Sequence, residues 1–239
     1  MRQSEDHLVR IAVNREMLEG DLNVPSGTPR VVVFAHGSGS SRHSPRNRHI
    51  AQMLRQSGLA TLLFDLLTPQ EEQIDMHTGH LRFDIGLLAQ RLIKATEWTV
   101  LNSELSGLQM GYFGASTGAA AAFVAAAERP ALINGIVSRG GRPDLAGPAL
   151  GNVQAPTLLI VGGHDLQVLK MNQEALAQLR VEKKLEAVEG ATHLFEEPGA
   201  LDEVGRRAGL WFARYLFEGQ PRVYPGEPRL SSEGKERAH

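Results

Sequence analysis

The stretch Gln109-Met110-Gly111-Tyr112-Phe113-Gly114-Ala115-Ser116-Thr117-Gly118 leads directly into an alanine-rich segment that ends near Ala127. Residues 109–113 form an apolar run, which is typical of a strand buried on both faces of a parallel sheet. The alanine-rich residues 117–127 predict a helix. Between them lies the pattern Gly-x-Ser-x-Gly, so the sequence predicts a tight strand–turn–helix connection with Ser116 at the turn.

The alternation of strand and helix extends outward from this stretch in both directions. Further apolar runs predict buried strands, and segments with apolar residues at three- and four-residue spacing predict helices between them. Two period-two stretches precede these and predict half-solvated antiparallel strands. The pattern predicts an α/β fold, a doubly wound, mostly parallel sheet flanked by helices. The predicted strands are residues 8–13, 17–24, 31–35, 61–64, 132–137, 157–161 and 185–188, and the other predicted helices are residues 48–56, 83–96, 172–179 and 201–216.

Length and composition fit one globular domain. The chain has 239 residues, of which 42% are hydrophobic and 22% charged, and this is enough to fill a sizeable core. Residues 1–217 contain no internal repeat and no interdomain linker, so we predict that they form a single domain. Residues 218–239 are rich in proline, glycine and charge and predict a C-terminal tail.

Charge and cysteine content exclude several classes of protein. The formal net charge is −2, so the chain lacks the basic footprint of a nucleic-acid-binding protein and a polybasic membrane anchor. No apolar run approaches the roughly 20 residues that span a bilayer. The polar, acidic first residues do not resemble a secretory signal, so we expect a cytoplasmic protein. The absence of cysteine excludes disulfides, thiolate metal ligands and a cysteine nucleophile.

Ser116 is the candidate nucleophile. A nucleophile elbow needs the predicted strand-to-helix turn, which holds the serine in a strained conformation between glycines. The following helix would place its positive dipole end and free N–H groups beside the reacting centre. The alternative is an ordinary glycine turn in which Ser116 caps the helix. The predicted strand and helix favour the elbow, and a phosphate loop fits less well because its G-x-x-x-x-G-K-[ST] lysine is absent.

A serine hydroxyl needs a histidine base, and the base needs an orienting carboxylate. In a sheet of this type the chain order is serine, acid, histidine, and both partners should follow strands at their carboxyl ends. Asp165 follows one buried strand and His193 follows the short last one, so we predict Asp165 as the acid and His193 as the base. The alternatives are a helix-capping Asp165, an ordinary loop histidine at 193, and Asp65 as the acid. His164 is expected to be structural.

Two backbone N–H groups should hold the developing oxyanion. One is predicted at Thr117, directly after the nucleophile. The other should come from the glycine-rich segment at residues 36–40, which follows a predicted strand. Ser38 is the first choice and Gly39 the second, and His36 is expected to stabilise the turn.

Four motifs together closely resemble the α/β-hydrolase superfamily: His36-Gly37-Ser38-Gly39, Gly114-x-Ser116-x-Gly118, Gly163-His164-Asp165 and Gly190-Ala191-Thr192-His193. Over about residues 31–216 the chain is similar to the dienelactone hydrolase-like branch, and most of all to small members found alone or joined to phosphoribosyltransferase domains. The resemblance implies an eight-stranded sheet with an antiparallel second strand, and hydrolysis through an acyl-enzyme. True dienelactone hydrolases carry cysteine in the elbow, so the serine points to esters other than dienelactone.

The expected substrate is a small-molecule carboxylic ester with a short acyl chain, and no cofactor or metal is expected. Residues 139–155 are too few for a lid domain, so the site should be shallow or shaped by neighbouring loops. Arg42, Arg139 and Arg142 lie on rim loops, where their side chains could bind a substrate carboxylate or phosphate. The alternative is that these arginines are solvated or paired with Asp144, Glu71 and Glu72. His77 and His80 lack the pattern of a metal site.

Two other functions fit the same sequence features. An acyltransferase or perhydrolase would keep the triad and pass the acyl group to an acceptor other than water. A non-catalytic hydrolase-fold binding protein is disfavoured, because every expected catalytic position is filled.

Overall fold

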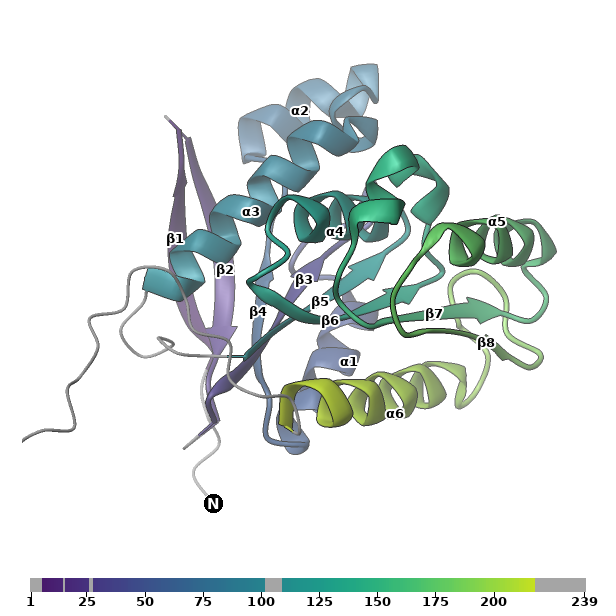
Figure 1. The fold of residues 1–239 in the computed structure, drawn as a ribbon. Coiled ribbons are helices and arrows are strands. Elements are labelled where there is room, and N and C mark those ends of the chain that lie inside the picture. Colours follow the sequence, from purple (N-terminus) through teal and green to yellow (C-terminus); the bar gives the residue numbers. More distant parts are fainter. Residues whose placement is uncertain (1–5, 15, 26–27, 102–108, 218–239) are drawn as a thin grey trace, which may run out of the picture.

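An eight-stranded sheet forms the centre of the chain (Figure 1). The computed structural model describes residues 6–14, 16–25, 28–101 and 109–217, so the tail predicted at 218–239 lies outside the described residues. The strand order is β1-β2-β4-β3-β5-β6-β7-β8. β2 is antiparallel to both of its neighbours and the other pairs are parallel, which confirms the predicted fold class. The strands are β1 (His7–Val13), β2 (Glu16–Asn23), β3 (Arg30–Ala35), β4 (Ala60–Phe64), β5 (Gln109–Ala115), β6 (Ile133–Arg139), β7 (Thr157–Gly162) and β8 (Lys183–Val188).

Helices cover both faces of this sheet (Figure 1). α3 packs against α4 on one face, and α1 packs against α6 on the other. Each face has its own hydrophobic core: Tyr112 and Phe123 belong to the first, and Phe34, Phe113 and Phe212 to the second. The helices are α1 (Pro45–Gln56), α2 (Pro69–Thr78), α3 (Ile85–Leu101), α4 (Thr117–Glu128), α5 (Leu166–Gln178) and α6 (Ala200–Phe212), with a π-helical turn at Ala213–Phe217 and 3-10 turns at Leu81–Phe83 and Pro143–Asn152.

Strand burial follows strand position. Every residue of β4, β5, β6 and β7 is buried, as continuous apolar runs predict for strands covered on both faces. β1 alternates between exposed and buried residues towards its end, and the edge strand β8 buries only Val188. The short apolar run at 185–188 is therefore the signature of an edge strand.

Two helix starts and one whole helix differ from the prediction. α1 begins earlier than residue 48, because Ser44 caps it and Pro45 occupies its first position. α5 begins at Leu166 and not at residue 172. α2 was not predicted, although Thr68 and Glu71 form a reciprocal capping box that marks its start. Between β6 and β7 the chain forms only 3-10 turns, so no lid domain is inserted there.

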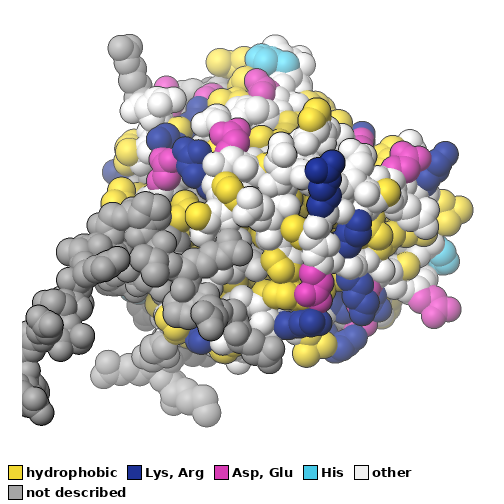
Figure 2. All heavy atoms as spheres, viewed as in Figure 1, with side chains coloured by type: hydrophobic (Ala, Val, Ile, Leu, Met, Phe, Trp, Pro, Cys, Tyr) yellow, Lys and Arg dark blue, Asp and Glu magenta, His cyan; other side chains and the backbone are white. Residues whose placement is uncertain are grey.

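One face of the molecule carries mixed charge (Figure 2). On the face drawn in Figure 2, basic and acidic side chains are interspersed and no single-sign patch dominates. None of the helices in the described residues is long and apolar enough to cross a membrane.

Candidate active site

Ser116 occupies a strained turn between β5 and α4. Its backbone has φ 50° and ψ −122°, a conformation that non-glycine residues rarely adopt. Its side chain makes no capping bond to α4, so the alternative of a helix-capping serine is not supported. A Cβ at Gly118 would lie 2.2 Å from the carbonyl oxygen of Ala35, and one at Gly114 would lie 2.5 Å from Cα of Ala119. The glycines of the motif are therefore required by close backbone approach.

The predicted acid and base are joined. His193 Nδ1 lies 2.6 Å from Asp165 Oδ2. Because a carboxylate only accepts, Nδ1 carries the hydrogen, which leaves Nε2 to accept a proton. Asp165 is the residue before α5, yet its side chain does not cap that helix. The structure thus brings Asp165 and His193 together, and Asp65, the alternative acid, lies instead against Arg42.

Backbone contacts hold the acid and histidine turns against each other. The N–H of Gly163 donates to the carbonyl of Val188 at 2.8 Å, and the N–H of His164 donates to that of Ala191 at 2.9 Å. A Cβ at Gly162 would lie 2.4 Å from the carbonyl oxygen of Thr192. The main chain of His164 therefore has the structural role predicted for that residue.

The turn after β6 lies between the serine and the histidine. The Ser116 N–H donates to the Arg139 carbonyl at 3.4 Å, and the Arg142 N–H donates to the Ser116 carbonyl at 3.1 Å. A Cβ at Gly140 would lie 3.6 Å from Cε1 of His193. Within the described residues, no hydrogen bond joins the Ser116 hydroxyl to His193. Catalytic hydrogen bonds are often long without substrate and shorten when substrate binds.

The loop after β3 packs directly on the serine turn. A Cβ at Gly37 would lie 3.0 Å from Cβ of Ser116. His36 is buried; its Nδ1 donates to the Gly37 carbonyl at 2.9 Å, and its Nε2 accepts from the Leu66 N–H at 3.0 Å. Burial lowers the pKa of His36, and both ring nitrogens are used within the turn. The predicted turn-stabilising role of His36 is confirmed.

The predicted oxyanion donors lie on both sides of this contact. Thr117 is the first residue of α4, so its N–H has no acceptor within the helix. The Ser38 N–H is occupied: it donates to Oγ1 of Thr117 at 2.9 Å. Gly39 has φ 69°, a left-handed conformation that favours glycine. The Thr117 N–H is thus available to an oxyanion, whereas the Ser38 N–H is bonded to the Thr117 hydroxyl.

The sequence matches the family model described as "Dienelactone hydrolase family" over residues 18–215. The chain belongs to the dienelactone hydrolase family. Two Mycobacterium tuberculosis proteins (strains CDC 1551 / Oshkosh and ATCC 25618 / H37Rv), both named "Putative phosphoribosyl transferase", are 53% identical over 211 residues, which is 88% of this chain and 47% of theirs. The chain therefore spans about half the length of these curated relatives.

Solved structures agree with this family. The dienelactone hydrolase from Anabaena variabilis ATCC 29413 is 58% identical, with a TM-score of 0.89 over 90% of this chain and 100% of that chain. Est1E from Butyrivibrio proteoclasticus is 13% identical, with a TM-score of 0.74 over 88% of this chain and 99% of that chain, and shares the fold. The family match and the Anabaena variabilis structure support a hydrolase.

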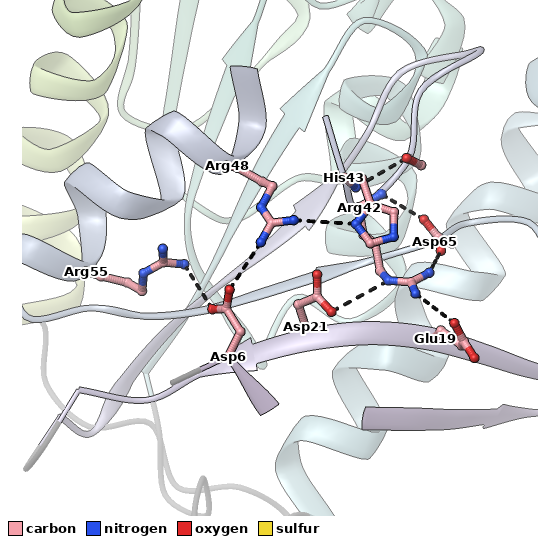
Figure 3. Close-up of polar contacts among 9 residues, drawn as sticks. Asp6, Glu19, Asp21, Arg42, His43, Arg48, Arg55 and Asp65 are labelled. Carbon is pink, nitrogen blue, oxygen red and sulfur yellow. Dashed lines mark hydrogen bonds and ion pairs between the residues drawn. The ribbon is translucent and has the colours of Figure 1, made fainter. Parts of the chain in front are cut away.

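Arg42, the first of the three arginines predicted to bind substrate, forms ion pairs with acidic residues of this dienelactone hydrolase family member. Arg42 NH2 lies 2.7 Å from Glu19, NH1 contacts Asp65, and Nε lies 3.6 Å from Asp21 (Figure 3). The Arg42 N–H also donates to Asp65 at 2.7 Å. These contacts favour a structural role for Arg42 over substrate binding, because three carboxylates surround its guanidinium and its side chain is only 14% exposed.

The other two arginines differ from each other. Arg142 makes a bidentate contact with Asp144 at 2.9 and 2.8 Å, which is the paired alternative stated above. Arg139 is buried and has no carboxylate partner among the described residues; its NH2 donates to Oδ1 of Asn47 at 3.4 Å. Burial, together with the nearby charge of Arg46, lowers the pKa of Arg139 to about 10.

A cavity of about 580 Å³ adjoins the loop after β3. The loop forms one wall, and α2 with the turn after it forms another, through Glu72, Met76 and Arg82. Burial and the neighbouring Asp65 raise the pKa of Glu72. The wall that α2 builds was not predicted, because that helix was missed in the sequence.

The described residues contain no cluster of three or more side chains able to hold a metal ion. His77 and His80 instead contact the Gln73 carbonyl and the Thr78 hydroxyl on the exposed side of α2.

Proposed function

We propose that this chain hydrolyses carboxylic esters through a serine nucleophile, Ser116, with short acyl chains favoured. The observation that carries the proposal is the strained serine turn at the end of β5 combined with a histidine–carboxylate pair, joined at 2.6 Å, after β8 and β7. Both features lie at the carboxyl ends of parallel strands, where sites of open sheets form.

In the proposed reaction, the Ser116 hydroxyl attacks the ester carbonyl and its proton passes to Nε2 of His193. Asp165 holds the ring in this tautomer and stabilises the imidazolium. The tetrahedral intermediate collapses, and the departing alcohol takes the proton from His193. Water then attacks the acyl-enzyme with His193 as base, which releases the acid and restores the serine.

The oxyanion binds to the Thr117 N–H at the start of α4, where the helix dipole also favours negative charge. The Ser38 N–H becomes the second donor once the Thr117 hydroxyl rotates away, and Gly39 follows it on the same loop. The reaction draws on these groups alone, without a cofactor.

The longer relatives are compatible with this proposal. The name "Putative phosphoribosyl transferase" was given to proteins about twice as long as the matched segment, which makes up 47% of their length. We assign ester hydrolysis to the matched part, with residues 1–217 as one catalytic domain, and phosphoribosyl transfer, where those relatives perform it, to the part that is not matched.

The test is active-site labelling together with kinetics on 4-nitrophenyl acetate and butyrate. A fluorophosphonate should modify Ser116 in the folded protein. Ser116→Ala should lower kcat by about 10⁴-fold or more. Asp165→Asn should lower kcat by about 10³–10⁴-fold, because the histidine then adopts the wrong tautomer.

Ser57→Ala is the matched control, since Ser57 follows α1 and, among the described residues, its hydroxyl bonds only to that helix. This variant should label and react like the wild type. Folded wild-type protein that gives no adduct on Ser116, or Ser116→Ala with full activity, would show that the serine mechanism is wrong.

A further inference from the structure

The guanidinium of Arg139 is buried without a counter-charge. The residue is 8% exposed, and no carboxylate forms an ion pair with it in the described part of the chain. Within the described ranges its side chain makes one hydrogen bond, the long contact with Asn47, and its Nε has no partner. A buried charge without a partner is costly, so such a group is retained where a ligand supplies the missing charge.

A second arginine, Arg46, and the N-terminus of α1 lie next to Arg139. Asn47 is in the first turn of α1, beside Arg46, whose charge acts on Arg139. Among the residues that the structure describes, Arg46 also has a buried Nε without a partner, and its one ion pair is a 3.6 Å contact with Glu196, which is 65% exposed. The first turn of α1 contains no acidic residue. Two guanidinium groups and the positive end of a helix dipole therefore converge.

This convergence lies beside the proposed catalytic groups. Arg139 ends β6, and its carbonyl accepts the Ser116 N–H. Its guanidinium carbon lies 6.0 Å from the ring centre of Phe195, two residues after His193. Arg46 lines the cavity beside the loop after β3. An anionic group held between these two arginines would therefore lie close to the turn that carries Ser116.

We propose that Arg139 and Arg46 form a subsite for an anionic group of the substrate, a carboxylate or a phosphate. This inference rests on the proposed ester hydrolysis and names the class of ester. Planar guanidinium forks make paired hydrogen bonds to either anion. On binding, the anion takes the place of Glu196 at Arg46 and supplies the counter-charge that Arg139 lacks.

Direct binding is measured first, by calorimetry with inorganic phosphate and with glutarate on the wild type. One or both should bind, and which one binds distinguishes a phosphate from a carboxylate subsite. Arg139→Gln and Arg46→Gln should each weaken that binding about tenfold or more, the value of one charge-assisted hydrogen bond. Arg206→Gln is the matched control, because Arg206 is on the exposed side of α6 and pairs with Glu203.

Kinetics use two esters that differ only in charge, 4-nitrophenyl butyrate and mono-4-nitrophenyl glutarate. Arg139→Gln and Arg46→Gln should lower kcat/KM for the glutarate ester about tenfold and leave the butyrate ester within about twofold. Equal losses on both esters, or a wild type that binds neither anion, would overturn the subsite. If Arg139→Gln does not fold, Arg46→Gln decides. Failure of the ester hydrolysis itself would appear separately, as absent turnover of both esters with anion binding intact.

Discussion

The turns that carry Ser116, Asp165 and His193 are held by main chain, whereas the loop between β3 and α1 is held by side chains. In the first region, glycines at 118 and 162 allow backbone atoms to approach to distances that no Cβ tolerates. In the second, buried His36 bonds to backbone on both sides, and Arg42 is tied to three carboxylates.

This difference determines which substitutions destabilise each region. A contact between backbone atoms has no rotamer that relieves an added methyl group, so a small substitution must move whole elements. When a charge or a proton is removed from a contact between charged or titratable side chains, the backbone keeps its conformation, but the contact stabilises the fold less. The catalytic turns should therefore be sensitive to volume, and the loop to charge and pH.

The largest effect is expected for Gly118→Ala. The new Cβ would lie 2.2 Å from the Ala35 carbonyl oxygen and 2.4 Å from that of His36, so α4 must move away from β3. We expect a loss of about 3 kcal/mol or more in unfolding free energy by urea denaturation. A loss of at least about 100-fold in kcat/KM should accompany it, because Ser116 moves with α4.

Gly151→Ala is the control for this substitution. A Cβ at Gly151 meets nothing within 4 Å, and this residue lies in the 3-10 turns after β6. Its unfolding free energy should change by less than about 0.5 kcal/mol. Equal effects at the two glycines would mean that close approach does not hold the serine turn.

The main-chain region is also the region that could be predicted from the sequence. Close backbone approach requires glycine, so the turns around Ser116, Asp165 and His193 leave a local signature beside apolar strands. The central strands were predicted for a different reason, since burial on both faces leaves a continuous apolar run. Helix starts were less accurate, because Pro45 and Leu166 lie outside the apolar periodicity.

The second effect in size is expected for Arg42→Gln. Asp21 and Asp65, which are 18% and 15% exposed, would lose their cation. We expect about 2 kcal/mol of destabilisation, seen as a fall in Tm of about 4–8 °C. Activity on neutral esters should fall less than about tenfold, because the loop that carries Ser38 loosens without losing its donor.

Arg142→Gln provides the comparison, because its pair with Asp144 is about one-third exposed on both sides. It should change the unfolding free energy by less than about 1 kcal/mol. Should Arg42→Gln keep the wild-type Tm and lose activity only on anionic esters, Arg42 would be a substrate ligand and the distinction between the two regions would fail.

Arg42 also shows why the side-chain-held loop could not be predicted. Its carboxylates come from β2 and from the residue after β4, and only the folded sheet brings them together (Figure 3). From the sequence, Arg42 and Arg139 are equivalent rim arginines. Their environments differ because one side chain meets three acids and the other enters the interior beside α1.

The smallest effect is expected from His36 and is a dependence on pH. Burial lowers the pKa of the folded-state imidazole, so the unfolded chain binds a proton at a higher pH than the folded protein does. Stability should therefore fall as pH drops below the ordinary histidine value of about 6.5 and continue to fall until the folded-state pKa is reached. His36→Gln removes this titration, so its urea unfolding free energy should decline less between about pH 8 and pH 5.5 than that of the wild type.

His77→Gln is the control, because His77 is exposed on α2, and its curve should run parallel to the wild type. His36 and Arg42 stabilise one loop through different partners, so their effects should not be independent. At low pH, protonation of His36 Nε2 removes the acceptor of the Leu66 N–H, and Arg42→Gln should then cost less than at high pH. Full additivity across pH would show that the two side chains hold separate structures, and the loop after β3 would no longer be one charge-dependent unit.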